Sequence, residues 1–443
     1  MKNKIIILAS IFLVGVVVVV GLSFFLLLTV YPTGSEPIDS VIGKVTPVYG
    51  IVVNGISYFS SKPFPEFIVD IPVDDAVSIG AADFDGDGDT DILATADSEN
   101  FLAWWRNDGK KFLRGIAFTK FIVESGYGIG YIDIDIADFD GDGDKDIIGA
   151  ESGLVTPYSK LGPAWGNEVV EPIKLGLVWW RNDRVDSTTK KVVFTKLLID
   201  KDGLSPVYVD DFDKDGNSDI LGVVRNEQGL TNIAWWRNDG KGSFRRTIID
   251  REENTFTVSP ADFVYSADFD RDGNQDVLSA GHSSIIWWKN EGRGIFIPKV
   301  ISRRSTWGNL WDIRIADIDG DGSEDVIGAT SNSIIWWKNN GKGTFEEIVI
   351  EQHSKAPTSV DIADFDKDGN LDIVVVYKGE GWQPLVWIKN DGKGNFTKII
   401  IGKILGGSHR ARTFDIDGDG DKDILAGAAW INTLTWWKNN LKK

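Results

Sequence analysis

The 443-residue sequence contains no cysteine, so disulfide bonds contribute nothing to its stability. It also contains no G-x-S-x-G, H-E-x-x-H, Walker or dinucleotide-binding motif, and so carries none of the common catalytic signatures. The formal net charge is −19, and no basic stripe or patch is visible. Because phosphates need such a patch for neutralisation, we do not expect nucleic acid as a partner.

Much of the acidic charge lies in one stretch of ten residues, DFDGDGDTDI in its first copy, with an acid at every second position. Carboxylates this close repel one another unless a cation lies among them. Oxygen ligands on a flexible glycine turn suit Ca²⁺, which takes six to eight oxygens at about 2.3–2.6 Å. The stretch recurs at intervals of 47 to 73 residues, which indicates a repeat protein. The seven copies begin at Asp83, Asp138, Asp211, Asp268, Asp317, Asp364 and Asp415.

An EF-hand is the obvious alternative, because Asp83, Asp85, Asp87 and Gly88 fit the first, third, fifth and sixth positions of its loop. The bidentate Glu of the twelfth position is absent from every copy, and the flanking sequences are β-branched strands instead of helices. The residues found there are Ala94, Gly149, Gly222, Ser279, Gly328, Val375 and Ala426. An aspartate at the ninth position must therefore close the loop: Asp91, Asp146, Asp219, Asp276, Asp325, Asp372 or Asp423.

Each unit has the pattern strand, acidic loop, strand, variable loop, W-W-[RK]-N strand, Asn-Asp-Gly-type turn and final strand. In the first unit we expect strands at Ile92 to Ala96 and at Leu102 to Asn107. The turn Asn107-Asp108-Gly109 would then lead to a strand starting at Phe112. Four antiparallel strands repeated seven times predict an all-β, seven-bladed β-propeller. One N-terminal transmembrane helix, predicted from the apolar run described below, would precede it.

The two ends of the repeat region are complementary. The last unit stops after Trp437 without a fourth strand, and PEFIVDI, Pro65 to Ile71, has the pattern of the fourth strand TFEEIVI, Thr344 to Ile350. We therefore expect an N-terminal strand at about residues 64–71 to complete the last blade, so that no sheet edge stays open.

The D-x-D-x-D-G-x-x-D loops resemble the FG-GAP/VCBS repeat family, whose calcium-loop propeller units also occur in integrin α-subunits. The resemblance covers roughly residues 64–443. It implies one structural Ca²⁺ per blade, about seven in all, bound between the first and second strands. Unlike integrins, this sequence keeps the loop in every blade, and its W-W-[RK]-N motif is typical of the microbial branch. It implies metal binding through side chains at positions 1, 3, 5 and 9 and the main-chain carbonyl at position 7, which are Asp83, Asp85, Asp87, Asp89 and Asp91; Asp138, Asp140, Asp142, Asp144 and Asp146; Asp211, Asp213, Asp215, Asn217 and Asp219; Asp268, Asp270, Asp272, Asn274 and Asp276; Asp317, Asp319, Asp321, Ser323 and Asp325; Asp364, Asp366, Asp368, Asn370 and Asp372; and Asp415, Asp417, Asp419, Asp421 and Asp423.

The N-terminus predicts membrane attachment. Lys2 and Lys4 precede an apolar run from Ile5 to Val30, which is long enough to span a bilayer. We expect residues 1–4 in the cytoplasm, 5–30 as the anchor, 31–63 as a linker and 64–443 as a propeller at the cell surface. A cleaved signal peptide is the alternative.

Most of the 18 tryptophans have a packing explanation. Neighbours on a strand face opposite sides, and both sides of a blade pack on adjacent blades. We therefore assign thirteen to the core: Trp104, Trp105, Trp179, Trp180, Trp235, Trp236, Trp287, Trp288, Trp336, Trp337, Trp387, Trp436 and Trp437.

The other five tryptophans and the three histidines fall in connections that we expect on the face opposite the acidic loops. With three arginines near inner strands, they are candidates for stacking on sugars and contacting anions, or they plug the channel. The set is Trp165, His282, Trp307, Trp311, Arg314, His353, Trp382, His409, Arg410, Arg412 and Trp430.

These observations favour a membrane-anchored extracellular binding or adhesion module for a glycan or protein ligand. One alternative is a lyase-like enzyme acting on polysaccharide, in which His409 would be the base and Arg410 and Arg412 would contact the substrate carboxylate. Another is a structural scaffold at the cell surface.

Overall fold

The structure is a computed structural model of the chain. The chain divides into two compact units, Met1–Val53 and Asn54–Lys443. The structure describes residues 64–441 apart from 71–72, 74–75, 97–99, 112–114, 127–131, 152–175, 185–191, 227–230, 251–260, 282–283, 293, 304–307, 354, 378–381, 406–407 and 429–432. The described residues all belong to the second unit.

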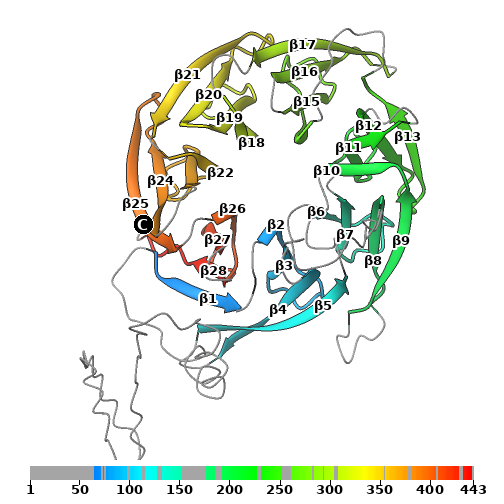
Figure 1. Ribbon diagram of the computed structural model, residues 1–443, viewed down its shortest axis with the longest axis vertical. Coiled ribbons are helices and arrows are strands. Elements are labelled where there is room, and N and C mark those ends of the chain that lie inside the picture. The colour runs from blue at the N-terminus through cyan, green and yellow to red at the C-terminus, as the bar shows by residue number, and fades with distance from the viewer. Residues whose placement is uncertain are drawn as a thin grey trace, which may run out of the picture. The chain divides into compact units, whose positions relative to one another are not determined.

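Seven four-stranded antiparallel sheets form the blades of a β-propeller (Figure 1), which confirms the propeller part of the predicted fold. The first strand of each blade is innermost, and the fourth lies on the outer rim. Blade numbers run along the chain. Blade 1 is β2 (Ala76–Ala82), β3 (Asp91–Ala96), β4 (Phe101–Lys111) and β5 (Gly115–Ser125); blade 2 is β6 (Ile132–Ala137), β7 (Asp146–Glu151), β8 (Leu177–Asn182) and β9 (Phe194–Asp200); blade 3 is β10 (Gly203–Asp210), β11 (Asp219–Arg225), β12 (Thr231–Asn238) and β13 (Phe244–Ile248).

The remaining blades repeat the arrangement. Blade 4 is β14 (Phe263–Ala267), β15 (Asp276–Ala280), β16 (Ser284–Asn290) and β17 (Phe296–Arg303); blade 5 is β18 (Leu310–Ala316), β19 (Asp325–Thr330), β20 (Ser333–Asn339) and β21 (Phe345–Gln352); blade 6 is β22 (Pro357–Ala363), β23 (Asp372–Tyr377), β24 (Trp382–Asn390) and β25 (Phe396–Leu405); blade 7 is β26 (Ser408–Phe414), β27 (Asp423–Ala428), β28 (Thr433–Trp437) and β1 (Glu66–Asp70).

β1 and β28 pair antiparallel, with Phe67 opposite Trp436, so that the two ends of the repeat region share blade 7. In Figure 1 the blue β1 accordingly lies beside the red β28. This is the pairing that the two complementary strand patterns predict, and it closes the ring by hydrogen bonds.

The hydrophobic core lies between the blades. Seven clusters of buried residues each combine side chains from two neighbouring blades, one cluster for each contact between blades. Between blades 1 and 2, for example, Phe84 and Trp104 pack with Ile147 and Trp180. Of the thirteen tryptophans expected in the core, twelve are buried, and Trp235 is half-buried. Because adjacent strand residues face opposite sides, each Trp-Trp pair supplies both flanks of its blade.

The turn predicted at Asn107–Gly109 is wrong, because β4 continues to Lys111 and pairs with β5 beyond a bulge between Asn107 and Lys110. Beyond the bulge, Lys110 lies opposite Ile116 and Lys111 lies opposite Gly115.

The expected anchor, residues 5–30, and the expected linker, residues 31–63, lie outside the described residues. Among the described residues, no helix has the length and apolar character needed to cross a membrane.

Candidate calcium loops and channel mouth

The acidic loops join the first and second strands of each blade, and their first aspartate organises the turn. Asp83 accepts hydrogen bonds from the backbone N–H groups of Gly86 (2.7 Å) and Gly88 (2.9 Å). The bond to the sixth-position glycine recurs in all seven loops at 2.7–3.0 Å. That glycine has a φ between 83° and 92°, a left-handed conformation that disfavours other residues. The loop is therefore curled around its carboxylates by its own backbone.

The ninth-position aspartate fastens the loop to the blade. Asp91 is fully buried, and its two oxygens accept from the backbone N–H groups of Phe84 (3.0 Å) and Asn107 (2.7 Å). The bond from the asparagine recurs in every blade at 2.7–2.8 Å. Burial raises the pKa of all seven ninth-position aspartates to about 6 or 7, against the effect of these hydrogen bonds. A cation in the loop would favour the charged form.

The donor geometry fits a hard cation. Carboxylate oxygens of Asp83, Asp85 and Asp91 lie within 4.8 Å of one another, and equivalent groups occur in other loops. Among the described residues, one buried oxygen of the third-position aspartate has no hydrogen-bond partner in five loops: those of Asp140, Asp213, Asp270, Asp319 and Asp366. A buried anionic oxygen without a donor is costly. An oxygen-only set of this kind suits Ca²⁺ better than metals that prefer nitrogen or sulfur ligands.

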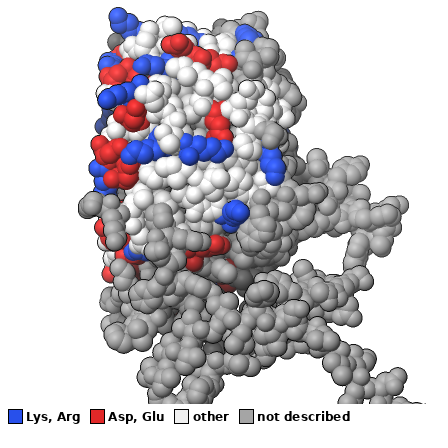
Figure 2. Space-filling model, turned by 90° about the vertical axis from the view of Figure 1, so that its left-hand side faces the viewer, with Lys and Arg blue, Asp and Glu red and all other residues white. Residues whose placement is uncertain are grey.

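The basic residue that follows the Trp pair was not assigned a role from the sequence. In blades 3 to 7 it contacts the acidic loop of its own blade: Lys289 binds Asp270 and Asp272 (2.7 Å), and Arg237 binds Asp213 (2.5 Å) and Asp215 (2.9 Å). Lys338, Lys389 and Lys438 contact their own loops in the same way. Figure 2 shows acidic and basic side chains interleaved along one edge of the ring. These cations screen the loop carboxylates. The basic residue at the third position of every copy of the W-W-[RK]-N motif is the sequence feature that could have indicated this contact.

The asparagine that ends the motif was also missed. Asn339 donates from Nδ2 to the carbonyl of Glu324 in its own blade (3.0 Å) and to that of Phe269 in the preceding blade (2.8 Å). Bonds to the preceding blade occur in six of the seven blades, the exception in the described structure being Asn290. Asn follows [RK] in the motif because its side chain joins two blades beneath the acidic loops.

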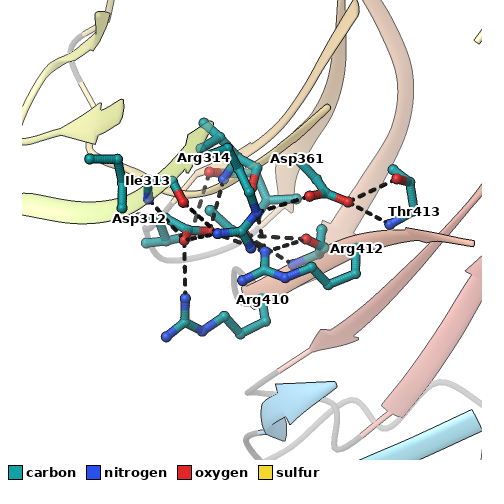
Figure 3. Close-up of polar contacts among 12 residues, drawn as sticks. Asp312, Ile313, Arg314, Asp361, Arg410, Arg412 and Thr413 are labelled. Atoms are coloured by element: carbon teal, nitrogen blue, oxygen red, sulfur yellow. Dashed lines mark hydrogen bonds and ion pairs between the residues drawn. The ribbon is translucent and has the colours of Figure 1, made fainter. Parts of the chain in front are cut away.

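Three of the candidate ligand-face arginines meet inside the central channel (Figure 3). Arg314, Arg410 and Arg412 all contact Asp312, a fully buried carboxylate, at 3.0–3.2 Å. Arg314 also donates to Asp361 (3.0 Å). Burial alone would lower the pKa of Arg314, but the neighbouring carboxylates outweigh it and raise that pKa. The three arginines that the sequence suggested as ligand contacts are therefore paired in the channel with two aspartates, Asp312 and Asp361, which neutralise part of their charge and which no sequence motif marks.

Two further carboxylates line a channel cavity of about 380 Å³ beside these arginines. Asp133 accepts from the Ser78 hydroxyl (3.2 Å) and the Val207 N–H (3.2 Å), and Asp135 accepts from the Val209 N–H (2.8 Å). Burial raises the pKa of both, that of Asp135 to about 7. Because Val207 and Val209 belong to β10, these acids join the inner strands of blades 2 and 3.

The other ligand-face candidates are spread over several blades. Trp311 is bulged out of β18 at the end away from the acidic loop, and it is 37% exposed. His353 lies after β21 and packs on Tyr377, with ring centroids 4.5 Å apart. Trp382 and His409 belong to β24 and β26 instead of the connections in which we expected them. The remaining four, Trp165, His282, Trp307 and Trp430, lie outside the described residues.

The family model for the FG-GAP-like repeat matches residues 83–149, 268–328, 317–375 and 364–426. The chain belongs to the FG-GAP-like repeat family. Each matched segment begins with one acidic loop and extends through the next, which agrees with the assignment of that loop as the repeated feature. No curated protein sequence matches the chain.

Solved structures similar to this FG-GAP-repeat chain include an Agrocybe aegerita lectin with specific recognition of non-reducing terminal N-acetylglucosamine. It is 20% identical, with 82% of this chain and 86% of that chain covered and a TM-score of 0.48. A second similar structure is BBS1N in complex with ARL6DN. It is 10% identical, with 86% of this chain and 100% of that chain covered and a TM-score of 0.52. The second likeness bears on the fold alone.

Proposed function

We propose that this FG-GAP-repeat propeller is a calcium-stabilised binding module, with a glycan or protein ligand at the channel mouth opposite the acidic loops. The observation that carries the proposal is Trp311. A β-bulge turns a side chain away from its regular direction, and here it leaves a tryptophan 37% exposed on an innermost strand. An exposed aromatic ring offers a face for stacking on a sugar or for anchoring a protein side chain.

The surroundings of Trp311 support a polar ligand. Asp312 follows it in β18 and holds Arg410 at 3.2 Å, and the Arg410 side chain is a quarter exposed. Arg410 also lies 5.8 Å from the ring centroid of Phe263. An arginine fixed by an ion pair and an aromatic neighbour loses little conformational entropy when it donates to a ligand hydroxyl or carboxylate.

The metal and the membrane form the second half of the proposal. Aspartates of the acidic loops would hold about seven Ca²⁺ ions, each neutralising the carboxylates of one loop and fixing the hairpin that joins two strands. Ile5–Val30 would anchor the chain with Lys2 and Lys4 in the cytoplasm, which would place the propeller outside the cell, where calcium is abundant. Protease added to intact cells should then remove the propeller and leave the anchor.

A glycan array tests ligand binding, run in millimolar calcium and again with a chelator. We expect calcium-dependent binding to one coherent class of sugar, and its loss in Trp311→Ala. Phe121→Ala is the matched control, since Phe121 is also an aromatic exposed to 37% but lies on the outer strand β5. Equal loss in both variants contradicts the assignment of the channel mouth. Silence across the array from folded protein contradicts the glycan ligand and favours a protein partner.

A further inference from the structure

The contacts between neighbouring blades are not uniform at the outer rim. Between blades 7 and 1, Asp70 near the end of β1 accepts from the Lys120 ammonium (3.1 Å) and from the Trp105 indole N–H (2.9 Å). We call this arrangement a rim latch: an acid on the outer strand of one blade, bound by a base on the outer strand of the next and by an aromatic donor. It is half-exposed, so the ion pair is weak alone, while the indole N–H needs its acceptor.

We call the contact between two neighbouring blades a seam. Rim latches are found at three further seams. Glu124 binds Lys196 (2.5 Å) and the Trp180 indole (2.7 Å) between blades 1 and 2. Asp200 binds Arg246 (2.8 Å) and the Trp236 indole (3.0 Å) between blades 2 and 3.

Between blades 5 and 6, Glu351 binds Lys398 and the Tyr377 hydroxyl (2.8 Å). Blade 6 has Ile388 where other blades have the second tryptophan, and Tyr377 supplies the donor instead.

At the other three seams the residue types exclude this ion pair. The position of the base is Pro298 in blade 4, Glu347 in blade 5 and Glu66 in blade 7, as their pairing with the second tryptophan of each motif shows. The position of the acid is Ser302 in blade 4 and Gly402 in blade 6. Between blades 4 and 5 the Ser302 hydroxyl donates to Glu347 (3.0 Å), a rim contact without a base.

These same three seams have a different contact, which we call a loop bridge. In a loop bridge, the fourth residue of one acidic loop binds the acidic loop of the next blade. Lys214 donates to the carbonyl of Gly273 in the next loop (2.7 Å), and Arg271 donates to the Asp321 carbonyl (2.7 Å) and the Ser323 hydroxyl (2.5 Å). Lys367 pairs with Asp421. The loops of the four rim-latched seams have glycine at this position: Gly86, Gly141, Gly320 and Gly418.

We propose that the loop bridge and the rim latch are alternative fasteners, and that a loop bridge built at a rim-latched seam replaces a lost rim latch. All seven seams have one or the other, and the sequence changes at both places together. The physical reason is that apolar packing between blades is non-directional. The asparagine bonds hold one point of a seam beneath the acidic loops, and a second polar contact, at the rim or between the loops, fixes the register of the two blades. Blade 4 has loop bridges on both sides, whereas blades 7, 1, 2 and 3 form a rim-latched run.

The glycine positions permit the exchange. Lys214, Arg271 and Lys367 adopt φ values of 59° to 60°, and Gly320 and Gly418 have φ values of 70° and 68°. The chain therefore already accepts long side chains in this conformation. A Cβ at Gly320 or Gly418 meets no atom within 4 Å, whereas one at Gly86 meets Arg184 at 2.2 Å. Gly320 is thus the place to build a bridge at the seam of blades 5 and 6.

The test measures amide hydrogen exchange in β21 and β23. Glu351→Ala removes the latch and leaves the buried Tyr377 hydroxyl without its acceptor, so we expect exchange to accelerate about 5- to 30-fold. Adding Gly320→Arg should restore most of the protection. Gly418→Arg, added to the same background, places an equal strain and charge at the wrong seam and should restore none.

Rescue that is equal for the two arginine variants, or absent for both, overturns the proposal. So does a Glu351→Ala protein whose exchange is unchanged at this seam. Should Glu351→Ala fail to fold, Glu351→Gln keeps an acceptor for Tyr377 and removes only the charge. The same comparison of Gly320→Arg with Gly418→Arg then applies, with the salt dependence of exchange as the measured quantity.

Discussion

Replacement of Asn339 by Ala is the sharpest test of how the blades are joined. The Asn339 side chain is fully buried and makes three hydrogen bonds, to the carbonyls of Phe269 and Glu324 and from the N–H of Gly341 (3.1 Å). Each bond contributes about 1 kcal/mol net, and a buried group left without a partner costs about 1–3 kcal/mol. We therefore expect the free energy of unfolding to fall by about 3–5 kcal/mol.

Asn290→Ala is the control for the bonds within one blade, because the half-buried Asn290 keeps the bonds to Gln275 (2.9 Å) and Gly292 (2.9 Å). In the described structure it makes no bond to the preceding blade. Denaturant unfolding of both variants in calcium should show a loss that is about 1–2 kcal/mol larger for Asn339→Ala. Equal losses would refute the role of Asn339 between blades, since the asparagine would then act within its own hairpin alone.

Two predictions concern the channel. The pKa of Asp135 is raised to about 7 from an ordinary value of 3.8, so its contribution to stability is fully present below pH 4 and is lost as the pH rises through 7. From pH 5 to pH 8, the free energy of unfolding of the wild type relative to Asp135→Asn should fall by about 1–2 kcal/mol, because solvent in the channel screens part of the effect of the pKa shift. Parallel pH profiles of the two proteins would contradict this. Arg314→Met should lower the free energy of unfolding by about 3 kcal/mol, because it removes the donor to Asp361 while Asp312 keeps two arginines; a loss below about 1 kcal/mol in denaturant titration would show that the network is dispensable.

Much of the fold was predictable because the repeat is written into the sequence several times over. The acidic loops, the Trp pairs and the complementary ends each point independently to a closed ring of seven four-stranded blades. The turn expected at Asn107–Gly109 was wrong because hairpin length depends on the residues beyond the turn, and in blade 1 these extend the ladder to Lys111.

The channel network was harder to predict. Asp312 and Asp361 stand in strand sequences, LWDIRIA and PTSVDIA, that look like ordinary alternating strands. Only the closed ring brings Asp312 to Arg410 and Arg412, which are 98 and 100 residues away in the chain. The asparagines of the W-W-[RK]-N motif were visible in every unit, but their bonds cross between blades, which the pattern of one unit cannot reveal.

Calcium binding by the acidic loops is the central claim, and a titration measures it directly. Metal-free protein should take up about seven Ca²⁺ ions per chain, and its melting temperature should rise with occupancy, because each site filled at about a hundred times its Kd adds about 2.7 kcal/mol. Binding of about seven ions with a rising melting temperature supports Ca²⁺ as a structural ion that stabilises the acidic loops of the propeller. A folded protein that binds no calcium, or that melts at the same temperature with calcium and with EDTA, contradicts it.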